Sequence, residues 1–211
     1  MSFVISSVLP FPQISWWCHA IRVEKVYWDT SEHFQKMSAR NRYSISAAGG
    51  AVKMSVPLLG GRDQRTAMKD VLISNEQDWQ KRHWRTLVSV YNRSPYFEFY
   101  AHTLQALFSQ KEERLVDFNL LSIHWLMQQL KLTFREETLP DYQKSYPDAL
   151  FDIRQIAIFK ETKSLDFPLY SQVFSDRSAF IPDLSLLDLL FAQGPYTLQW
   201  LRDNCEKVIG P

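Results

Sequence analysis

The chain has 211 residues and a mass of 24.9 kDa, the size of one domain with a substantial buried core. Apolar residues make up 45% and charged residues 22%, a balance that excludes wholesale disorder. The net charge of +1 is too small for a surface that tracks phosphates, so we expect no nucleic-acid partner. Two cysteines, Cys18 and Cys205, exclude a four-cysteine zinc site and a disulfide-rich scaffold. We expect a cytoplasmic protein in which both thiols are reduced.

The first third of the chain is predicted to be rich in strands. Residues 3–9 and 23–28 form apolar runs typical of buried strands, with a short helix expected at 14–21. The uncharged stretch 3–20 also suggests a signal peptide, but it lacks a basic start and a small-residue cleavage site. We therefore favour a strand followed by a helix. Residues 42–47 and 52–56 alternate around Gly49 and Gly50, which indicates a β-hairpin.

The middle of the chain changes to a helical period. Ser74 and Gln77 have the spacing of a capping box, which predicts the start of a helix whose apolar arc contains tryptophan and histidine. The Ser94-Pro95 pair predicts the start of a second helix, and residues 115–130 predict a third. A short strand is expected at 71–73.

The last third is predicted to be mixed. Residues 132–136 and 153–159 are expected to be short strands. Ser185 and Gly194 predict the two ends of a helix, and a final helix is expected to reach about residue 208. The expected fold is thus a single α/β or α+β domain over residues 1–211, a sheet layered with helices, with a strand-rich first third and a helical middle. No segment has the length and apolar character of a membrane span.

The densest group of chemically capable side chains lies between residues 31 and 42. If this segment is extended, Lys36, Ser38, Arg40 and Arg42 point to one side, because side chains alternate along a strand. Arginine binds phosphate or carboxylate through a planar pair of donors, and lysine adds a point charge. A diphosphate or carboxylate site is one interpretation, and a solvated strand edge is the other. Two further polar side chains of this segment are available to orient a ligand or to brace the backbone: Gln35 and Asn41.

A second candidate pair lies on the apolar arc of the first long helix. Trp79 and His83 are four residues apart and therefore share a face. Burial among apolar neighbours favours the neutral imidazole, which makes His83 a candidate general base. The alternative is a core histidine whose nitrogens are satisfied by a backbone carbonyl.

A third candidate is the aromatic stretch 91–100. Rings that carry hydroxyl groups suit a sugar or a nucleobase, so Tyr91 and Tyr96 are candidate pocket residues. The alternative is a helix junction in which the aromatic residues fill the core. The glycines form neither a dinucleotide-binding nor a phosphate-loop motif, and the five histidines show no metal-ligand spacing. We therefore expect no resident metal site and make no assignment of a cofactor.

Several of these segments occur in an order that resembles a known family of bacterial proteins, the WbqC-like protein family. The most specific of them is the string Gln-Lys-Met-Ser-Ala-Arg-Asn-Arg at 35–42. The stretch 184–191 is similar to members from the Bacteroidetes. The first-strand histidine and the following tyrosine of many members are absent here. The resemblance rests on these segments of the chain: Pro10-Phe-Pro-Gln13, residues 33–42, Ser55-Val-Pro57, Trp79 with Lys81 and His83, residues 91–100, and Leu184-Ser-Leu-Leu-Asp-Leu-Leu-Phe191.

The resemblance implies a role in making or decorating surface polysaccharides such as O-antigen. A transferase that attaches glycine to a sugar has been proposed for the family. The function expected here is a transferase that moves glycine, another aminoacyl group or a different group to an activated sugar. The 35–42 string would bind the phosphates or a carboxylate of the substrate, and His83 would be the base. The alternatives are a non-catalytic module that binds a nucleotide-sugar or glycan precursor, and a structural protein that forms a homodimer through exposed aromatic residues.

Overall fold

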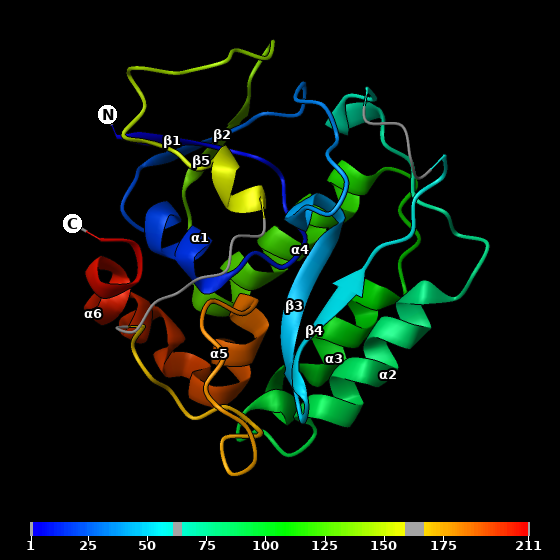
Figure 1. Cartoon of the computed structure of the whole chain (residues 1–211), viewed down its shortest axis with the longest axis vertical. Coiled ribbons are helices and arrows are strands. Elements are labelled where there is room, and N and C mark those ends of the chain that lie inside the picture. Colours follow the sequence, from blue (N-terminus) through cyan, green and yellow to red (C-terminus); the bar gives the residue numbers. More distant parts are fainter. Residues whose placement is uncertain (1, 61–64, 159–166, 211) are drawn as a thin grey trace.

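The computed structural model describes residues 2–60, 65–158 and 167–210, and it has a mixed α/β fold (Figure 1). Four parallel strands form the main sheet in the order β5-β2-β1-β6. Their bounds are Phe3–Ser6 for β1, Lys25–Trp28 for β2, Arg135–Thr138 for β5 and Phe151–Asp152 for β6. Helix α1, Ile14–Ala20, follows β1 and confirms the prediction of a strand and a helix near the N-terminus.

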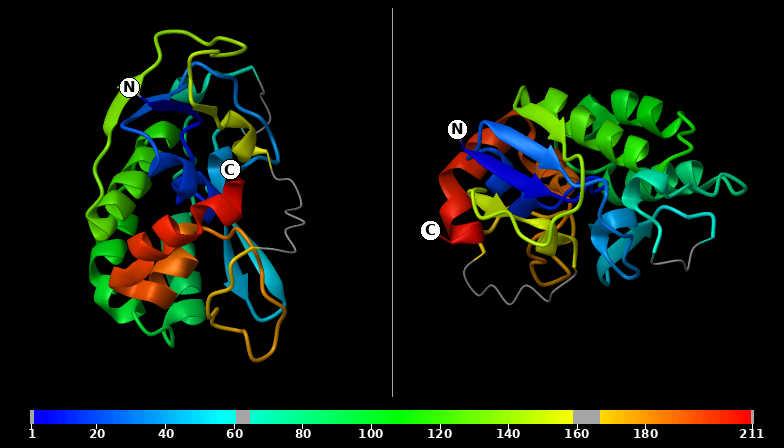
Figure 2. Two further views of the ribbon diagram at one scale, coloured as in Figure 1. Left: turned by 90° about the vertical axis from the view of Figure 1, so that its left-hand side faces the viewer. Right: turned by 90° about the horizontal axis from the view of Figure 1, so that it is seen from above.

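A separate antiparallel hairpin consists of β3, Arg42–Ala47, and β4, Gly50–Ser55. It confirms the hairpin expected around Gly49 and Gly50, and it pairs Arg42 with Ser55 at its open end. Seen from the side, the green helices of the central region lie on one side of the molecule and the cyan hairpin on the other (Figure 2). The segment before β3 is therefore where the hairpin meets the rest of the fold.

The helical part contains α2, Trp79–Tyr91; α3, Phe97–Phe108; and α4, Leu115–Leu130. The bounds of α4 agree with the sequence prediction. Near the C-terminus, α5 spans Leu186–Gln193 and α6 spans Thr197–Ile209. Ser185 caps α5 by accepting a hydrogen bond from the amide of Leu187.

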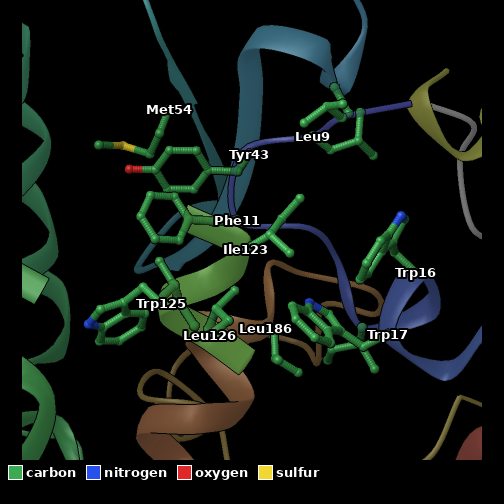
Figure 3. Close-up of a cluster of buried hydrophobic side chains, with 14 of the residues drawn as sticks. Leu9, Phe11, Trp16, Trp17, Tyr43, Met54, Ile123, Trp125, Leu126 and Leu186 are labelled. Carbon is green, nitrogen blue, oxygen red and sulfur yellow. The ribbon is translucent and has the colours of Figure 1, made fainter. Parts of the chain in front are cut away.

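The centre of the core is aromatic (Figure 3). Trp16 stacks on Trp28 at 5.8 Å between ring centroids and donates its indole N–H to the Ser6 hydroxyl. Phe11 packs against Tyr43 and thereby joins the loop after β1 to the hairpin. Aromatic side chains bury more apolar surface per residue than other side chains and so stabilise a core most. These rings therefore hold the hairpin against the part of the fold that contains the main sheet.

Helix α4 crosses this core and holds the loop after β1 with polar side chains. Asn119 donates to the backbone carbonyls of Val8 and Arg40, each at 2.8 Å, and Ser122 accepts from the amide of Phe11. Buried amide and hydroxyl groups need such partners. The loop after β1 and the segment around residue 40 are thus fixed to the same helix.

Four details differ from the sequence prediction. Helix α2 begins at Trp79, without a side-chain cap, so the capping box expected at Ser74 and Gln77 does not form. Helix α3 begins two residues after Pro95. Residues 72 and 73 make only single bridges instead of a strand. The strand expected at 153–159 is displaced to β6, and a 3-10 turn, η3, takes its place at Arg154–Ala157; residue 159 lies outside the described residues.

Candidate functional site

The 35–42 string does not run as one extended strand. Met37 has a left-handed backbone with φ 58°, and Ala39–Asn41 form a 3-10 turn, η1. Ser38 caps this turn: its hydroxyl accepts from the amide of Arg40 and donates to the carbonyl of Gln35 at 2.6 Å. The expectation that Lys36, Ser38, Arg40 and Arg42 share one side is therefore wrong, because the turn rotates successive side chains away from each other.

Arg40 is buried, with 2% of its surface exposed. Its Nε and Nη2 donate to the two oxygens of Glu32 at 3.0 and 2.5 Å, a bidentate pair. Its Nη1 is also buried, and no described residue accepts a hydrogen bond from it. Arg40 and Gln35 line a cavity of about 320 Å³, which we call the Arg40 cavity.

Arg42 is placed differently. It makes no ion pair with any described residue, its Nε is buried without a partner, and its Nη1 contacts the Met37 sulfur at 3.3 Å. Arg42 and the exposed Lys36 line a hollow of about 510 Å³, the Lys36 cavity, whose other lining residues carry no charge. Two cations without a carboxylate favour an anionic ligand there.

Arg42 also lines a second cavity, of about 390 Å³. Residues 9–13 and 181–185 form much of the wall, and Asp183 supplies a carboxylate, so we call it the Asp183 cavity. Asn41 also lines the Lys36 cavity, but its side-chain amide braces the backbone there by donating to the Val56 carbonyl at 2.9 Å. The string therefore divides its cations among separate cavities.

Two residues of the Asp183 cavity have an unusual backbone. Phe11 has φ 40° and Asp183 has φ 54°, a region that side chains other than glycine adopt at a cost of roughly 1 kcal/mol or more. Such strain is found preferentially at functional sites. The Asp183 carboxylate accepts from the amide and hydroxyl of Ser15, both at 2.7 Å, and burial raises its pKa. A carboxylate with a raised pKa is a better proton acceptor at neutral pH than an ordinary one.

His83 lies in the core, 6% exposed, and lines none of these cavities. Its Nε2 is 3.1 Å from the Ser55 carbonyl and its Nδ1 is 3.1 Å from the Tyr43 hydroxyl. Because a carbonyl only accepts, Nε2 carries the proton and Nδ1 accepts from tyrosine. Burial lowers the pKa of His83 to about 4. This geometry is that of a core histidine that joins α2 to both hairpin strands.

The aromatic candidates are also dispersed. Trp79 is buried, packs edge-on against His83 and donates to the Asn75 side chain. Tyr91 is buried, and its hydroxyl donates to Asp188 at 2.6 Å. Tyr96 is half-buried beside α5 and lines none of the three cavities. These residues occupy a helix junction, and none of them lines a cavity together with the 35–42 string.

The sequence did not single out Arg154 and Asp152, which line the Arg40 cavity, or the buried Asp29, which binds Arg154. Arg154 donates to Asp29 at 2.8 Å and binds Asp152 through two nitrogens, at 2.9 and 2.5 Å. These contacts raise the pKa of Arg154. Asp29 follows β2 and Asp152 ends β6, so the cluster lies at the carboxyl edge of the parallel sheet, where such sheets usually bind ligands. In the sequence, only Asp29, which comes directly after the predicted strand 23–28, hinted at this cluster.

The chain matches the model of the WbqC-like protein family over residues 11–162. The protein belongs to this family. The matched region contains the whole 35–42 string and all the residues that line the Arg40 cavity, whereas Asp183 lies beyond it. No significant match was found among curated proteins or among solved structures.

Two further observations bear on the expected partners. Within residues 2–60, 65–158 and 167–210, no cluster of three or more histidine, cysteine or acidic side chains has the arrangement of a metal site. In that same part of the chain, no helix combines the length and the apolar character needed to cross a membrane.

Both cysteines are free, and burial raises the pKa of Cys18.

Proposed function

We propose that this WbqC-like protein is a transferase that acts on an activated sugar during the assembly of a bacterial surface polysaccharide. The family membership supports the polysaccharide role. The observation that carries the proposal is the position of Arg42, which lines both the Lys36 cavity and the Asp183 cavity. A transfer reaction needs two substrates side by side, and this residue borders two cavities.

Lys36 and Arg42 hold the phosphates or a carboxylate of the activated substrate in this proposal. They are the charged residues of the Lys36 cavity, and Arg42 has an unpartnered buried Nε ready to donate. A nucleotide-sugar supplies a diphosphate of the matching charge. Arg40 does not contribute to this cation pair, because Glu32 neutralises it.

Asp183 takes the role of general base in the Asp183 cavity. It removes the proton of an attacking amine or hydroxyl as that atom forms the new bond, and the leaving group departs with the electrons of the broken bond. Ser15 fixes the carboxylate through two hydrogen bonds, which leaves lone pairs directed elsewhere. The sequence predicted His83 as the base. In this proposal His83 instead holds α2 against the hairpin, since both of its ring nitrogens are hydrogen-bonded within the core.

The binding step is tested by calorimetric titration with a panel of uridine, guanosine and thymidine diphosphate sugars. Arg42→Ala should weaken the best ligand roughly ten- to hundredfold, because a charge-assisted hydrogen bond contributes about 1.5–3 kcal/mol. Arg85→Ala removes an exposed arginine of α2 that lines none of the three cavities and should leave affinity unchanged. Equal affinity of the Arg42 variant and wild type would remove this site from the proposal.

The chemical step is tested with Asp183→Asn. Asparagine tolerates the left-handed backbone of this position, so the fold should be preserved. Product formation from the nucleotide-sugar panel with amine and hydroxyl acceptors, followed by mass spectrometry, should fall by about a hundredfold or more while nucleotide-sugar affinity persists. If wild type binds a nucleotide-sugar but forms no product with any acceptor, the non-catalytic binding module becomes the better description.

A further inference from the structure

The Arg40 cavity is not used by the proposed transfer, and it has the features of a separate binding site. We infer that it binds a neutral sugar unit, such as one residue of a glycan chain. The cavity lies at the carboxyl edge of β2 and β6 and encloses about 320 Å³, within the range of small-ligand pockets. This inference does not depend on any reaction at Arg42 or Asp183.

A buried donor without a partner indicates that a ligand belongs in the cavity. Arg40 is 98% buried, and Glu32 occupies its Nε and Nη2. Nη1 is left without an acceptor among the described residues, although buried guanidinium groups are normally saturated. Arg40 itself lines the cavity, so a ligand hydroxyl there is the acceptor that we infer for this nitrogen. The site is therefore built into the fold and does not rest on exposed side chains alone.

The charges around the cavity favour a neutral ligand over an anion. Glu32 offsets Arg40 and Asp152 offsets Arg154, which also binds the fully buried Asp29 outside the lining; Lys144 is exposed. Each guanidinium group of the cavity thus has a carboxylate partner, in contrast to Arg42 in the Lys36 cavity. Sugar hydroxyls both donate and accept, so they match a lining of carboxylates, guanidinium groups and the amides of Gln35 and Gln155.

An aromatic ring completes the arrangement. Tyr142 lines the cavity and is 54% exposed, and the guanidinium of Arg154 lies 5.3 Å from its ring centroid. A ring held in this way offers an apolar face to the C–H surface of a pyranose.

Arg154 also makes the cavity rigid. Its Nη1 and Nη2 donate to the carbonyls of Gln143 and Lys144, at 2.8 and 3.2 Å, and so attach the loop that carries Tyr142 to the strand ends. Preorganisation of this kind lowers the entropy cost of binding. The loop is visible as the long yellow-green segment between β5 and β6 in Figure 1.

The inference is tested on the full chain by saturation-transfer NMR with methyl glycosides of glucose, galactose and N-acetylglucosamine, and with pyrophosphate as the anionic probe. At least one glycoside should receive saturation, and its affinity should change less than about twofold between about 50 and 500 mM NaCl, because a neutral ligand is not screened. Tyr142→Ala should weaken that glycoside about tenfold, and Tyr142→Trp should retain it.

Tyr196→Ala is the matched control, since Tyr196 is also an exposed tyrosine but lies in the turn before α6, and this variant should bind the glycoside as wild type does. Arg40→Lys, which keeps a positive charge beside Glu32 but loses Nη1, should also weaken the glycoside. The inference is overturned if no glycoside receives saturation, if Tyr142→Ala binds as wild type does, or if pyrophosphate displaces the glycoside. Arg42→Ala should leave glycoside binding intact, which separates this test from that of the proposed function.

Discussion

At the residue scale, Arg40 and Arg42 show how two similar side chains in one short string acquire different roles. The turn η1 directs Arg40 into the protein, where Glu32 neutralises it, and Arg42 follows at the start of β3 with a free Nε. Arg40 lies inside the 3-10 turn, whereas Arg42 has the extended backbone of β3, with φ −142° and ψ 148°. Local backbone geometry therefore separates a guanidinium that suits a neutral ligand from one that suits an anion.

Asp188 is the other residue whose surroundings define its role. This buried carboxylate of α5 accepts from the hydroxyls of Tyr91, at 2.6 Å, and Tyr170, at 2.8 Å. Burial raises its pKa, whereas the tyrosine hydrogen bonds lower it. The cluster connects α2, α5 and the segment that contains Tyr170, which gives the buried Tyr91 a packing role.

We predict that Tyr170→Phe lowers the free energy of unfolding by about 1–3 kcal/mol, because it leaves a buried carboxylate with one donor fewer. Chemical denaturation of both proteins measures this difference. Tyr100→Phe is the matched control, since no described residue hydrogen-bonds to the Tyr100 hydroxyl, and it should change stability by less than about 0.5 kcal/mol. Equal losses in the two variants would contradict the role given to the Asp188 cluster.

At the element scale, the end of α5 depends on one glycine. Gly194 has φ 55° and ψ −125°, a conformation that is nearly restricted to glycine, and it allows the chain to turn into η4, Gly194–Tyr196. A Cβ at this position would also overlap the ring carbons of Tyr96. Tyr96 therefore acts as a packing residue at the junction of α3, α5 and α6.

Gly194→Ala should lower the free energy of unfolding by roughly 2 kcal/mol or more, from backbone strain and the overlap with Tyr96 together. The double variant Gly194→Ala/Tyr96→Ala separates these causes, because the smaller side chain relieves the overlap but not the strain. Thermal and denaturant unfolding provide the measurement. Gly49→Ala, where a Cβ would meet no atom within 4 Å, is the control and should be nearly neutral.

At the scale of the whole molecule, the buried histidine makes stability depend on pH. The folded protein keeps His83 neutral down to about pH 4, whereas the unfolded chain takes up the proton near the ordinary pKa of 6.5. Acidification from pH 6.5 to pH 4 therefore favours the unfolded chain. The contribution of this residue is fully present above pH 6.5 and is lost as the pH falls.

We predict that the stability difference between wild type and His83→Gln decreases by about 3 kcal/mol between pH 7 and pH 4, as the shift in pKa implies. Denaturant titrations of both proteins across this range measure it. His102→Gln, a change at an exposed histidine of α3, is the control. A difference that stays constant with pH would show that His83 takes up its proton equally readily in both states.

Much of the secondary structure could be predicted because its signals are local. The period of α4, the alternation of β3 and β4 and the cap at Ser185 each depend on residues a few positions apart. The failures were short segments, such as residues 36–42 and 153–158, where tertiary contacts decide between a strand and a 3-10 turn. The Ser38 cap is visible in the sequence, but a run of alternating polar residues suits a strand equally well.

The sequence by itself determined the mixed α/β class, the hairpin and the special character of the 35–42 string, because periodicity, turn residues and residue types carry that information. Only the tertiary structure decided which cation meets which carboxylate. Arg154 reaches Asp29 across 125 positions, and Asp183 reaches Ser15 across 168. It also placed His83 in the core. The Arg154–Asp29 contact arises because two distant strand ends meet at one edge of the sheet, and the Asp183–Ser15 contact because the segment before α5 packs on α1. No local pattern of residues encodes either meeting.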